Sequence, residues 1–440
     1  MLHWGQLLSS LRSNQKAGSV ESSRSSFEQD FDRIIFSHPF RRLQDKTQVH
    51  PLPEHDFVHT RLTHSLEVSS VGRSLGKKVG EAIVQRHPDL KNQITASDIG
   101  AVVAAGSLAH DLGNPPFGHA GEEAISDFFR HHEFGRSFQH EVTEAQWADL
   151  INFEGNAQGF RIITRNQYGL KLTFATLGAF TKYPCQAHFP ARNKKKKSQK
   201  KYGFFQSEFD KFKEVAIATG LNQIEENCWQ RHPLAFLVEA ADDICYSIID
   251  LEDGCRLGLV SFDDTVDLLA GILGNKLNRE KLKSISDLNE QLGVLRAMAI
   301  NSLTEDCCQV FLDNEPAILS GTFDSALTDA GSFADSLKMI SEVSINKIYR
   351  ARPVMEIEAA GFEALPGLME EFTRAALQLV RENQPRKSAT VARLMPVEFV
   401  QTMEQTHDIY QILRHVTDLV SGLTDRHALA LYRKIKGISL

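Results

Sequence analysis

Residues 109–125 read AHDLGNPPFGHAGEEAI and place two pairs of polar residues on either side of a Gly-Asn-Pro-Pro segment. His110 and Asp111 form the first pair, and His119 and Glu122 form the second. Imidazole and carboxylate groups bind divalent metals in mixed nitrogen and oxygen sites, and a buried Asp needs an ion or a donor beside it. A histidine with a neighbouring carboxylate suits proton transfer. The stretch therefore predicts a metal pair followed by a proton-transfer pair.

The His-Asp pair also has a purely structural interpretation. The preceding residues, SDIGAVVAAGSLA, predict a buried helix with Ser97 as its N-cap. His110 at the end of that helix would interact favourably with the helix dipole, and Asp111 would cap the turn. An isolated His-Asp dipeptide would favour this interpretation, so the metal hypothesis depends on further ligands elsewhere in the chain.

Two other segments offer such ligands, since one divalent ion needs more than two. His64 lies on a predicted helix over residues 57–87, and Asp242 lies inside a strongly apolar helix. Asp242, Tyr246 and Asp250 recur every four residues and share one helix face, which would present one ligand and two substrate contacts to a single pocket. The alternative is that these acids pair with arginines where helices pack.

The elements that must position these residues are predicted to be helical almost throughout. Helical periodicity marks residues 57–87, 171–184 and much of 260–440. Pro233 suits the first turn of the apolar helix, and Gly254 is the expected terminator. Because strand signals are few, the sequence predicts an all-α fold with at most one small hairpin, around a lysine run.

The chain divides by composition into three parts. Residues 1–28 are Ser-rich and are expected to form a flexible lead-in, followed by a core over 29–260 and a helical C-terminal region over 261–440. The core contains a basic loop, 190–206, with seven basic residues between Arg192 and Lys201. Such a run is most often a solvated loop, although it could also hold phosphates or single-stranded DNA.

Composition limits the class of protein. The 440 residues are 42% hydrophobic and 24% charged, with a net charge of -7, so no general attraction to nucleic acid or anionic membranes is expected. The six cysteines show no CxxC spacing, which favours unpaired thiols in a reducing compartment. No window approaches the ~20 apolar residues of a membrane span, and no signal peptide is evident. We therefore expect a cytoplasmic protein.

Several motifs together carry a family resemblance. RLTHSLEV, AHDLGNPPFGHAGE and LVEAADDICYSIIDLEDG, in this order, resemble the HD-domain deoxynucleoside triphosphate triphosphohydrolases, the dGTPase-like family. The likeness extends from SHPFRRLQDKTQV through FEGNAQGFRI and KYGFFQSE to VSGLTDRHAL, and so covers most of the chain. It implies an all-α HD core with a helical C-terminal extension that completes the pocket and the oligomer interface.

The resemblance implies a role for each matching residue. His64, His110, Asp111 and Asp242 would bind one divalent ion, with Mg²⁺ or Mn²⁺ favoured over other transition metals. His119 would be the catalytic histidine, and Glu122 its acidic partner. Residues near the phosphates and sugar would be Gln48, Arg61 and Asn114, and those that read the deoxyribose would be Tyr246 and Asp250.

One position departs from the family pattern. Many relatives have FEHN where this chain has Phe153-Glu154-Gly155-Asn156, so their additional histidine is missing. His119 and Glu122 must then supply the proton transfer, and His140 is kept as a further candidate pocket residue.

The resemblance implies a definite reaction and assembly. The expected reaction is hydrolysis of a deoxynucleoside triphosphate, dGTP by family analogy, at the α-phosphate to give deoxynucleoside and inorganic triphosphate. The resemblance also implies a homo-oligomer, commonly a hexamer. The alternatives are another HD-type nucleotide phosphohydrolase and a non-catalytic nucleotide-sensing protein.

Overall fold

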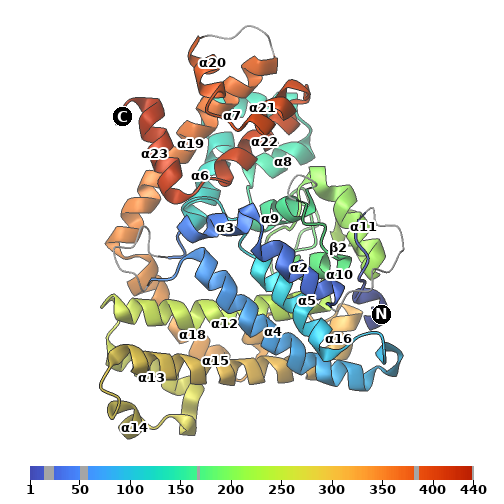
Figure 1. Ribbon diagram of the computed structural model, residues 1–440, viewed down its shortest axis with the longest axis vertical. Helices are drawn as coiled ribbons and strands as arrows, with labels where there is room; N and C mark the ends of the chain where they lie inside the picture. Colours follow the sequence, from blue (N-terminus) through green and yellow to red (C-terminus); the bar gives the residue numbers. More distant parts are fainter. Residues whose placement is uncertain (14–23, 50–57, 166–168, 381–385, 439–440) are drawn as a thin grey trace.

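The computed structural model describes residues 1–13, 24–49, 58–165, 169–380 and 386–438. These residues form helices and one very small sheet, which confirms the predicted all-α architecture (Figure 1). Within these ranges, no helix combines the length and hydrophobicity needed to cross a membrane. The helices of the N-terminal half are α1 (Trp4–Leu7), α2 (Ser26–Ile35), α3 (His38–Arg42), α4 (Arg61–Arg86), α5 (Ala96–Ala109), α6 (Gly118–Arg130), α7 (Glu133–Arg136), α8 (Glu144–Ile151), α9 (Gly155–Thr164), α10 (Phe174–Phe180) and α11 (Phe209–Thr219). The later helices are α12 (Pro233–Arg256), α13 (Phe262–Leu273), α14 (Arg279–Lys283), α15 (Leu288–Asp313), α16 (Glu315–Ser320), α17 (Leu327–Ala330), α18 (Ala334–Val343), α19 (Arg352–Val380), α20 (Arg386–Ala392), α21 (Val397–Glu404), α22 (Ile409–Ser421) and α23 (Asp425–Lys436).

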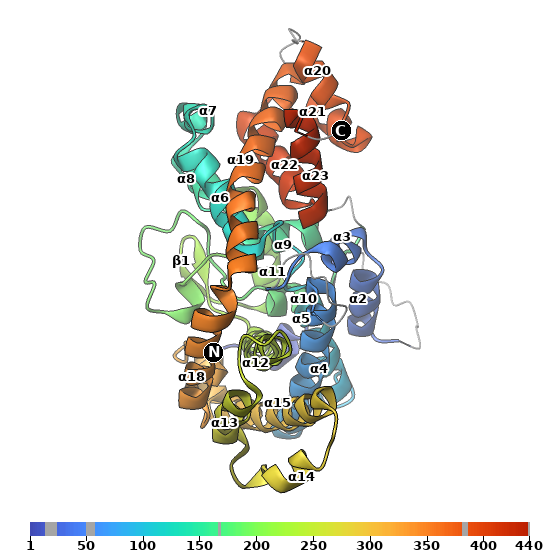
Figure 2. The same cartoon turned by 90° about the vertical axis from the view of Figure 1, so that its left-hand side faces the viewer.

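The centre of the fold is a close pair of helices, α4 and α5, which α12 packs against (Figures 1 and 2). The pair approaches closely because glycines occupy the seam: a Cβ atom at Gly76 would lie 2.9 Å from the Cα atom of Gly100. Helix α15 lies along both α12 and α4. The core between these helices includes Val68, Leu75, Val79, Val103, Leu108, Leu237 and Ile244.

Side-chain caps fix where the two central helices begin. Thr60 and Thr63 form a capping box at the start of α4, and Thr95 and Asp98 form one at the start of α5. The predicted N-cap of α5, Ser97, is therefore wrong and lies in the first turn. These caps fix where each helix begins and therefore which side chains face the other helix. The start of α4 and the end of α5 carry the polar residues His64 and His110.

Helix α12 begins as predicted but continues further. Pro233 stands in its first turn, and the helix runs on to Arg256. Gly254, the expected terminator, is instead buried inside the helix. A Cβ atom there would lie 2.4 Å from Ile348 Cδ1, so the glycine permits close packing against residues 344–349.

The N-terminus differs from the expected flexible lead-in over residues 1–28. Trp4 and Leu7 are buried in the core, and Arg12 forms a buried ion pair of 2.5 Å with Asp30. Apolar burial and this ion pair hold the segment in place, so the prediction is wrong for its first residues. The Ser-rich part over residues 14–23 lies outside the described residues.

A small hairpin is present, but not at the lysine run. Strand β1 (Gln223–Glu225) pairs antiparallel with β2 (Cys228–Trp229). The lysine run contains a short 3-10 turn, Lys197–Gln199. Strands of two and three residues are too short to show alternation, which is why their position was mispredicted.

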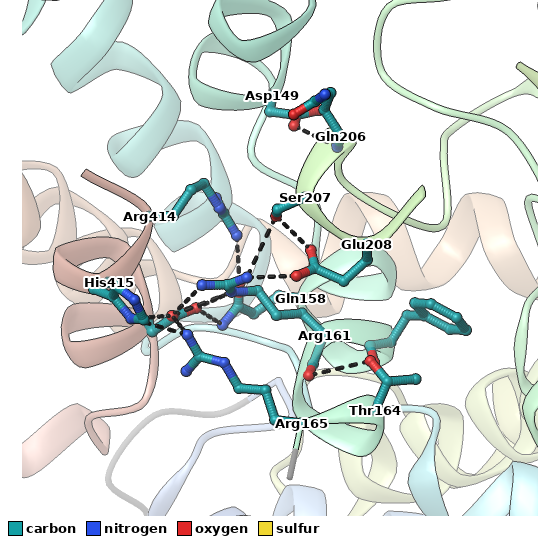
Figure 3. A network of polar contacts seen from close by, with 12 residues as sticks. Asp149, Gln158, Arg161, Thr164, Arg165, Gln206, Ser207, Glu208, Arg414 and His415 are labelled. Atoms are coloured by element: carbon teal, nitrogen blue, oxygen red, sulfur yellow. Dashed lines mark hydrogen bonds and ion pairs between the residues drawn. The ribbon is translucent and has the colours of Figure 1, made fainter. Parts of the chain in front are cut away.

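The C-terminal helices form a second apolar cluster with α6, and α19 runs between this cluster and the lower part of the molecule (Figure 2). A buried charge network fastens them to the core (Figure 3). Arg161 of α9 makes two 2.9 Å contacts with the carboxylate of Asp418 on α22, and it also pairs with Glu208. Arg165 pairs with the same Asp418. The network fixes the C-terminal helices against the core that carries the candidate site.

Candidate active site

One cavity of about 540 Å³ opens between the central helices, the basic loop and α19. It collects residues from segments that are far apart in the chain. The predicted site residues that line it are Gln48, Arg61, His64, His110, Asp111, Asn114, His119, Glu122, Asp242 and Tyr246. The fold therefore brings these ten residues into one pocket, which no single motif could show.

The floor of the cavity holds a compact set of possible metal ligands. His64, His110 and Asp111 are buried and offer ligand atoms that all lie within 4.8 Å of one another. Asp242 reaches the same point from α12, where its Oδ1 atom lies 3.3 Å from His64 Nε2 and 3.4 Å from His110 Nε2. These four candidate ligands come from helices α4 and α12 and from the turn that follows α5, and their side chains converge.

The donor atoms fit a divalent cation. His110 Nδ1 donates to the carbonyl oxygen of Ser107 at 2.7 Å, which directs Nε2 toward the carboxylates of Asp111 and Asp242. That Nε2 atom is buried and has no hydrogen-bond partner among the described residues. Burial lowers the pKa of His110, but Asp111 and Asp242 raise it above its usual value, so the two carboxylates attract positive charge to Nε2. A bound divalent cation would take the place of the proton. The set of two imidazoles and two carboxylates suits Mn²⁺ and other transition metals, and its oxygens suit Mg²⁺.

Neighbouring cations keep the two carboxylates ionised. Burial alone would raise the pKa of Asp111, but His110 and Arg61 lower it below its usual value, and Arg61 Nη1 lies 3.0 Å away. Burial also opposes ionisation of Asp242, whose pKa is nevertheless held well below its usual value, chiefly by Lys182. Lys182 Nζ lies 2.6 Å from Asp242 Oδ2. Both acids therefore carry negative charge toward the cluster.

Beside this cluster stands the second pair, His119 and Glu122. His119 Nδ1 lies 2.9 Å from Glu122 Oε2, and the His119 side chain is 85% exposed whereas that of Glu122 is 12% exposed. Glu122 also accepts a 2.7 Å hydrogen bond from the backbone N–H of Gly155. Burial would raise the pKa of Glu122, but its bond to His119 and the charge of Lys201 lower it. A fixed, ionised carboxylate thus orients an accessible imidazole.

The basic run contributes directly to the cavity. Lys197, Lys200 and Lys201 line it, and Lys201 Nζ lies 3.1 Å from Glu154 and 3.7 Å from Glu122. Lys200 is exposed, and Lys197 and Lys201 are half-buried, so the run is a loop that is only partly solvated. Because clustered lysines neutralise phosphate charge, their position favours the phosphate-holding alternative.

Comparisons with known proteins identify two family domains and several similar proteins. The HD domain matches residues 61–167, and the phosphohydrolase-associated domain matches residues 330–434. A deoxyguanosinetriphosphate triphosphohydrolase-like protein of Synechocystis sp. is 44% identical and covers 100% of both chains. A protein of the same description from Pseudomonas aeruginosa is 37% identical over 100% of this chain and 99% of its own. The deoxyguanosinetriphosphate triphosphohydrolase of Salmonella arizonae is 29% identical over 94% of each chain.

The chain belongs to the HD-domain deoxyguanosinetriphosphate triphosphohydrolase-like family. It is therefore an HD-domain hydrolase. The HD match includes His64, His110 and Asp111 together with His119 and Glu122, whereas Asp242 lies beyond it on α12. The candidate metal site is thus completed from outside the matched domain.

Gly155, the position at which the sequence analysis expected a departure from the family pattern, lies between the two polar pairs of the site. A Cβ atom there would lie 2.2 Å from Asn114 Oδ1 and 2.7 Å from Glu122 Oε1. Both neighbours belong to the site, and Asn114 in turn donates a 2.5 Å hydrogen bond to Asp111. Residue 155 therefore acts through its backbone N–H, and its lack of a side chain leaves room for the two polar pairs.

Two predicted residues do not line the cavity of this family member. Asp250 is 2% exposed and accepts a 2.8 Å hydrogen bond from the hydroxyl of Tyr349. Tyr349 stacks on Tyr246, with ring centroids 5.5 Å apart, and both rings line the cavity. Asp250 is thus placed behind the pocket wall because helix α12 turns it toward Tyr349. His140 lies on the short turn Ser137–Glu141 and is likewise absent from the lining.

Several residues of the pocket were missed by the sequence analysis. Lys182 lies in the stretch 171–184 that was predicted to be helical, but helix α10 ends at Phe180. Tyr349 is the last residue of a π-helical turn. Helix α19 adds Val354, Ile357 and Glu358 to the lining. The sequence predicted only that this region is largely helical, and the tertiary arrangement shows that the first turns of α19 face the pocket.

Proposed function

We propose that this HD-domain hydrolase is a metal-dependent deoxynucleoside triphosphate triphosphohydrolase. The observation that carries the proposal is the single cavity, which joins a His-Asp ligand cluster, a His-Glu dyad and several cationic side chains. Attack on a triphosphate ester needs charge neutralisation, an aligned water and a proton for the leaving oxygen. These three sets of residues meet the three needs. The printed names of the relatives support dGTP as the first substrate to test.

The residues divide the work as follows. A divalent ion, Mg²⁺ or Mn²⁺, bound by His64, His110, Asp111 and Asp242 would supply Lewis-acid charge and would activate water. His119 donates a proton to the 5′-oxygen as its bond to the α-phosphorus breaks. Glu122 holds the Nδ1 proton and stabilises the charged imidazole. The products are a deoxynucleoside and inorganic triphosphate.

Cationic side chains are placed to hold the triphosphate. Arg61 adjoins the ligand cluster, where it pairs with Asp111, while Lys197, Lys200 and Lys201 line the wall of the basic loop. Gln48, Asn114 and Tyr246 supply polar atoms for the rest of the nucleotide. We propose that Asp250 acts on the sugar only indirectly, through Tyr349.

The proposal is tested with a panel of the four deoxynucleoside triphosphates, each with Mg²⁺ or Mn²⁺. Separation of the products by anion exchange should show deoxynucleoside and triphosphate in a 1:1 ratio. Release of phosphate or diphosphate would instead indicate another HD-type phosphohydrolase. Nucleotide binding without turnover in any reaction would support a sensing protein.

We further propose a homo-oligomer, hexameric by family resemblance, in a cytoplasmic setting. The core over 29–260 would carry the ligands, and the region over 261–440 would complete the pocket and provide the oligomer interface. The lining residues on α19 support the first part, and six buried free cysteines support a reducing compartment. Size-exclusion chromatography with light scattering tests the assembly.

Single-stranded DNA remains a candidate partner for the run from Arg192 to Lys201. Lys194, Lys195 and Lys196 are exposed and do not line the cavity, so they are accessible to a longer phosphate chain. Retention of the protein on immobilised single-stranded DNA at low salt, lost as salt rises, would support this role. Salt-insensitive activity together with no retention would contradict it.

A further inference from the structure

Two cysteines, Cys185 and Cys228, lie opposite each other next to the basic loop. Cys185 and Cys228 are partners in an isolated antiparallel bridge. The backbone N–H groups of Gln186 and Trp229 each donate to the carbonyl that precedes the opposite cysteine, at 3.1 and 2.8 Å. This pattern places the cysteines at a non-hydrogen-bonded pair, where Cα atoms are about 4.5 Å apart and side chains are closest. That spacing falls within the range of about 4.4–6.8 Å that disulfides span.

The two thiols interact with each other. A hydrogen bond from Cys228 lowers the pKa of Cys185, and this contact together with burial raises the pKa of Cys228. Arg192 lowers the pKa of Cys185 further. A thiolate is the reactive form of cysteine, so the pair has one nucleophilic thiol and one thiol placed to resolve it.

The remaining cysteines lack this arrangement. Cys245 and Cys255 lie on α12, and Cys307 and Cys308 are consecutive on α15. Side chains at consecutive helix positions do not face each other. The Cys185–Cys228 pair is therefore distinguished by geometry, and the other thiols provide an internal comparison within the same chain.

The pair is coupled to the basic loop by direct contacts. The Cys185 thiol donates to the carbonyl of Lys201 at 3.4 Å, and its carbonyl accepts from the N–H of Gly203 at 3.0 Å. On the other side, the Gln199 amide donates to Cys228 Sγ at 3.9 Å. The cysteines thus support a segment that presents Lys200 and Lys201 to the cavity.

We propose that Cys185 and Cys228 form a reversible disulfide that regulates the site by changing how the basic loop is seated. Both cysteines are 0% exposed, so the oxidant must be small, and hydrogen peroxide is the class that fits. Oxidation removes the thiol proton that Cys185 donates to the Lys201 carbonyl. The lysines then bind the triphosphate less well.

The chemistry balances with one peroxide. The Cys185 thiolate attacks a peroxide oxygen, the O–O bond breaks, and a sulfenic acid and hydroxide form. Cys228 then attacks the Cys185 sulfur, the S–S bond forms and the S–O bond breaks to release a second hydroxide. The two thiol protons convert both hydroxides to water. Two electrons pass from the thiols to the peroxide, and a dithiol reductant reverses the reaction.

The first test is made on the reduced full-length protein. It is exposed to hydrogen peroxide, blocked with iodoacetamide and digested for peptide mass analysis. The expected result is a peptide pair linked through Cys185 and Cys228, released by dithiothreitol, while the other cysteines remain alkylated thiols. Recovery of the two cysteines as separate alkylated thiols or sulfinic acids would overturn the proposal.

The second test measures the effect on turnover and so rests on the proposed function. Oxidation should raise KM for dGTP by about two- to five-fold, as expected when a solvent-screened lysine leaves a phosphate, and dithiothreitol should reverse it. Cys228→Ser should abolish the response, whereas Cys255→Ser should keep it. A linked peptide with unchanged KM would overturn the regulatory role. If the oxidised protein gave the linked peptide but the reduced protein did not hydrolyse dGTP, only the proposed function would be refuted.

Discussion

The substitution Glu122→Gln tests the proton-transfer dyad directly. Glu122 Oε2 lies 2.9 Å from His119 Nδ1, and Oε1 accepts the N–H of Gly155 at 2.7 Å. Glutamine preserves the shape and the second bond, but it replaces Oε2 with an NH₂ group that cannot accept the imidazolium proton. A hydrogen bond to a charged group contributes about 1.5–3 kcal/mol. Because about 1.36 kcal/mol corresponds to a tenfold rate, kcat should fall by about 10- to 150-fold.

The assay is steady-state release of triphosphate from dGTP, with bound metal and thermal unfolding measured on the same samples. His119→Ala sets the lower limit, and the double variant should be no slower than His119→Ala because the two residues act as one unit. Glu123→Gln is the matched control, since Glu123 pairs with Arg130 at 3.2 Å on the surface. A Glu122→Gln rate within twofold of wild type, or a loss explained by missing metal, would refute the dyad.

Three further perturbations test the site and its support. Gly155→Ala should lower kcat by at least tenfold and destabilise the fold by about 1–3 kcal/mol, because the new Cβ would lie 2.2 Å from Asn114 Oδ1. The control Gly293→Ala, at an open helical position, should have neither effect. Calorimetry and rate measurements on both variants test this. His110→Ala should reduce bound Mn²⁺ measured by elemental analysis while the protein stays folded by circular dichroism, and full metal retention would contradict the ligand assignment. Burial raises the pKa of Asp250 from 3.8 to about 8. As pH rises, Asp250 therefore ionises in the unfolded chain before it ionises in the folded protein. Its contribution to the free energy of unfolding should fall across that window by on the order of 5 kcal/mol. Asp250→Asn should flatten this slope in denaturant titrations, and an unchanged slope would contradict the assignment.

Residues placed by helical spacing were the easiest to predict. Asp242 and Tyr246 stand four residues apart on α12, and both line the cavity. His64 lies in the first turn of α4, where a capping box fixes its direction. Local periodicity determined the face on which these side chains lie. Periodicity did not determine which helices meet. The prediction that the four candidate ligands converge therefore depended on the family resemblance.

Residues between helices were the hardest to predict. Lys182 reaches Asp242 at 2.6 Å from a segment without regular structure, and Cys185 meets Cys228 across a bridge of single residues. Lys182 was predicted to lie in a helix over residues 171–184, but the helix ends at Phe180, and the bridge between the two cysteines has no sequence signal. Gly155 is an intermediate case: the sequence shows the missing histidine, but the space that the glycine leaves for Asn114 is visible only in the fold.

The turn between the two polar pairs shows why distant sequence matters for the site. Phe117 has a left-handed backbone conformation at φ 64°, an unfavourable one for a bulky residue, and its N–H donates to Asp425 at 3.1 Å. Buried Lys46 bridges the same turn to the C-terminal region by donating to the carbonyls of Asn114 and Ser421, at 2.5 and 2.9 Å. Since Asp425 and Ser421 follow the turn by some 300 residues, the relative placement of the candidate metal ligands and the proposed proton donor is a property of the whole fold.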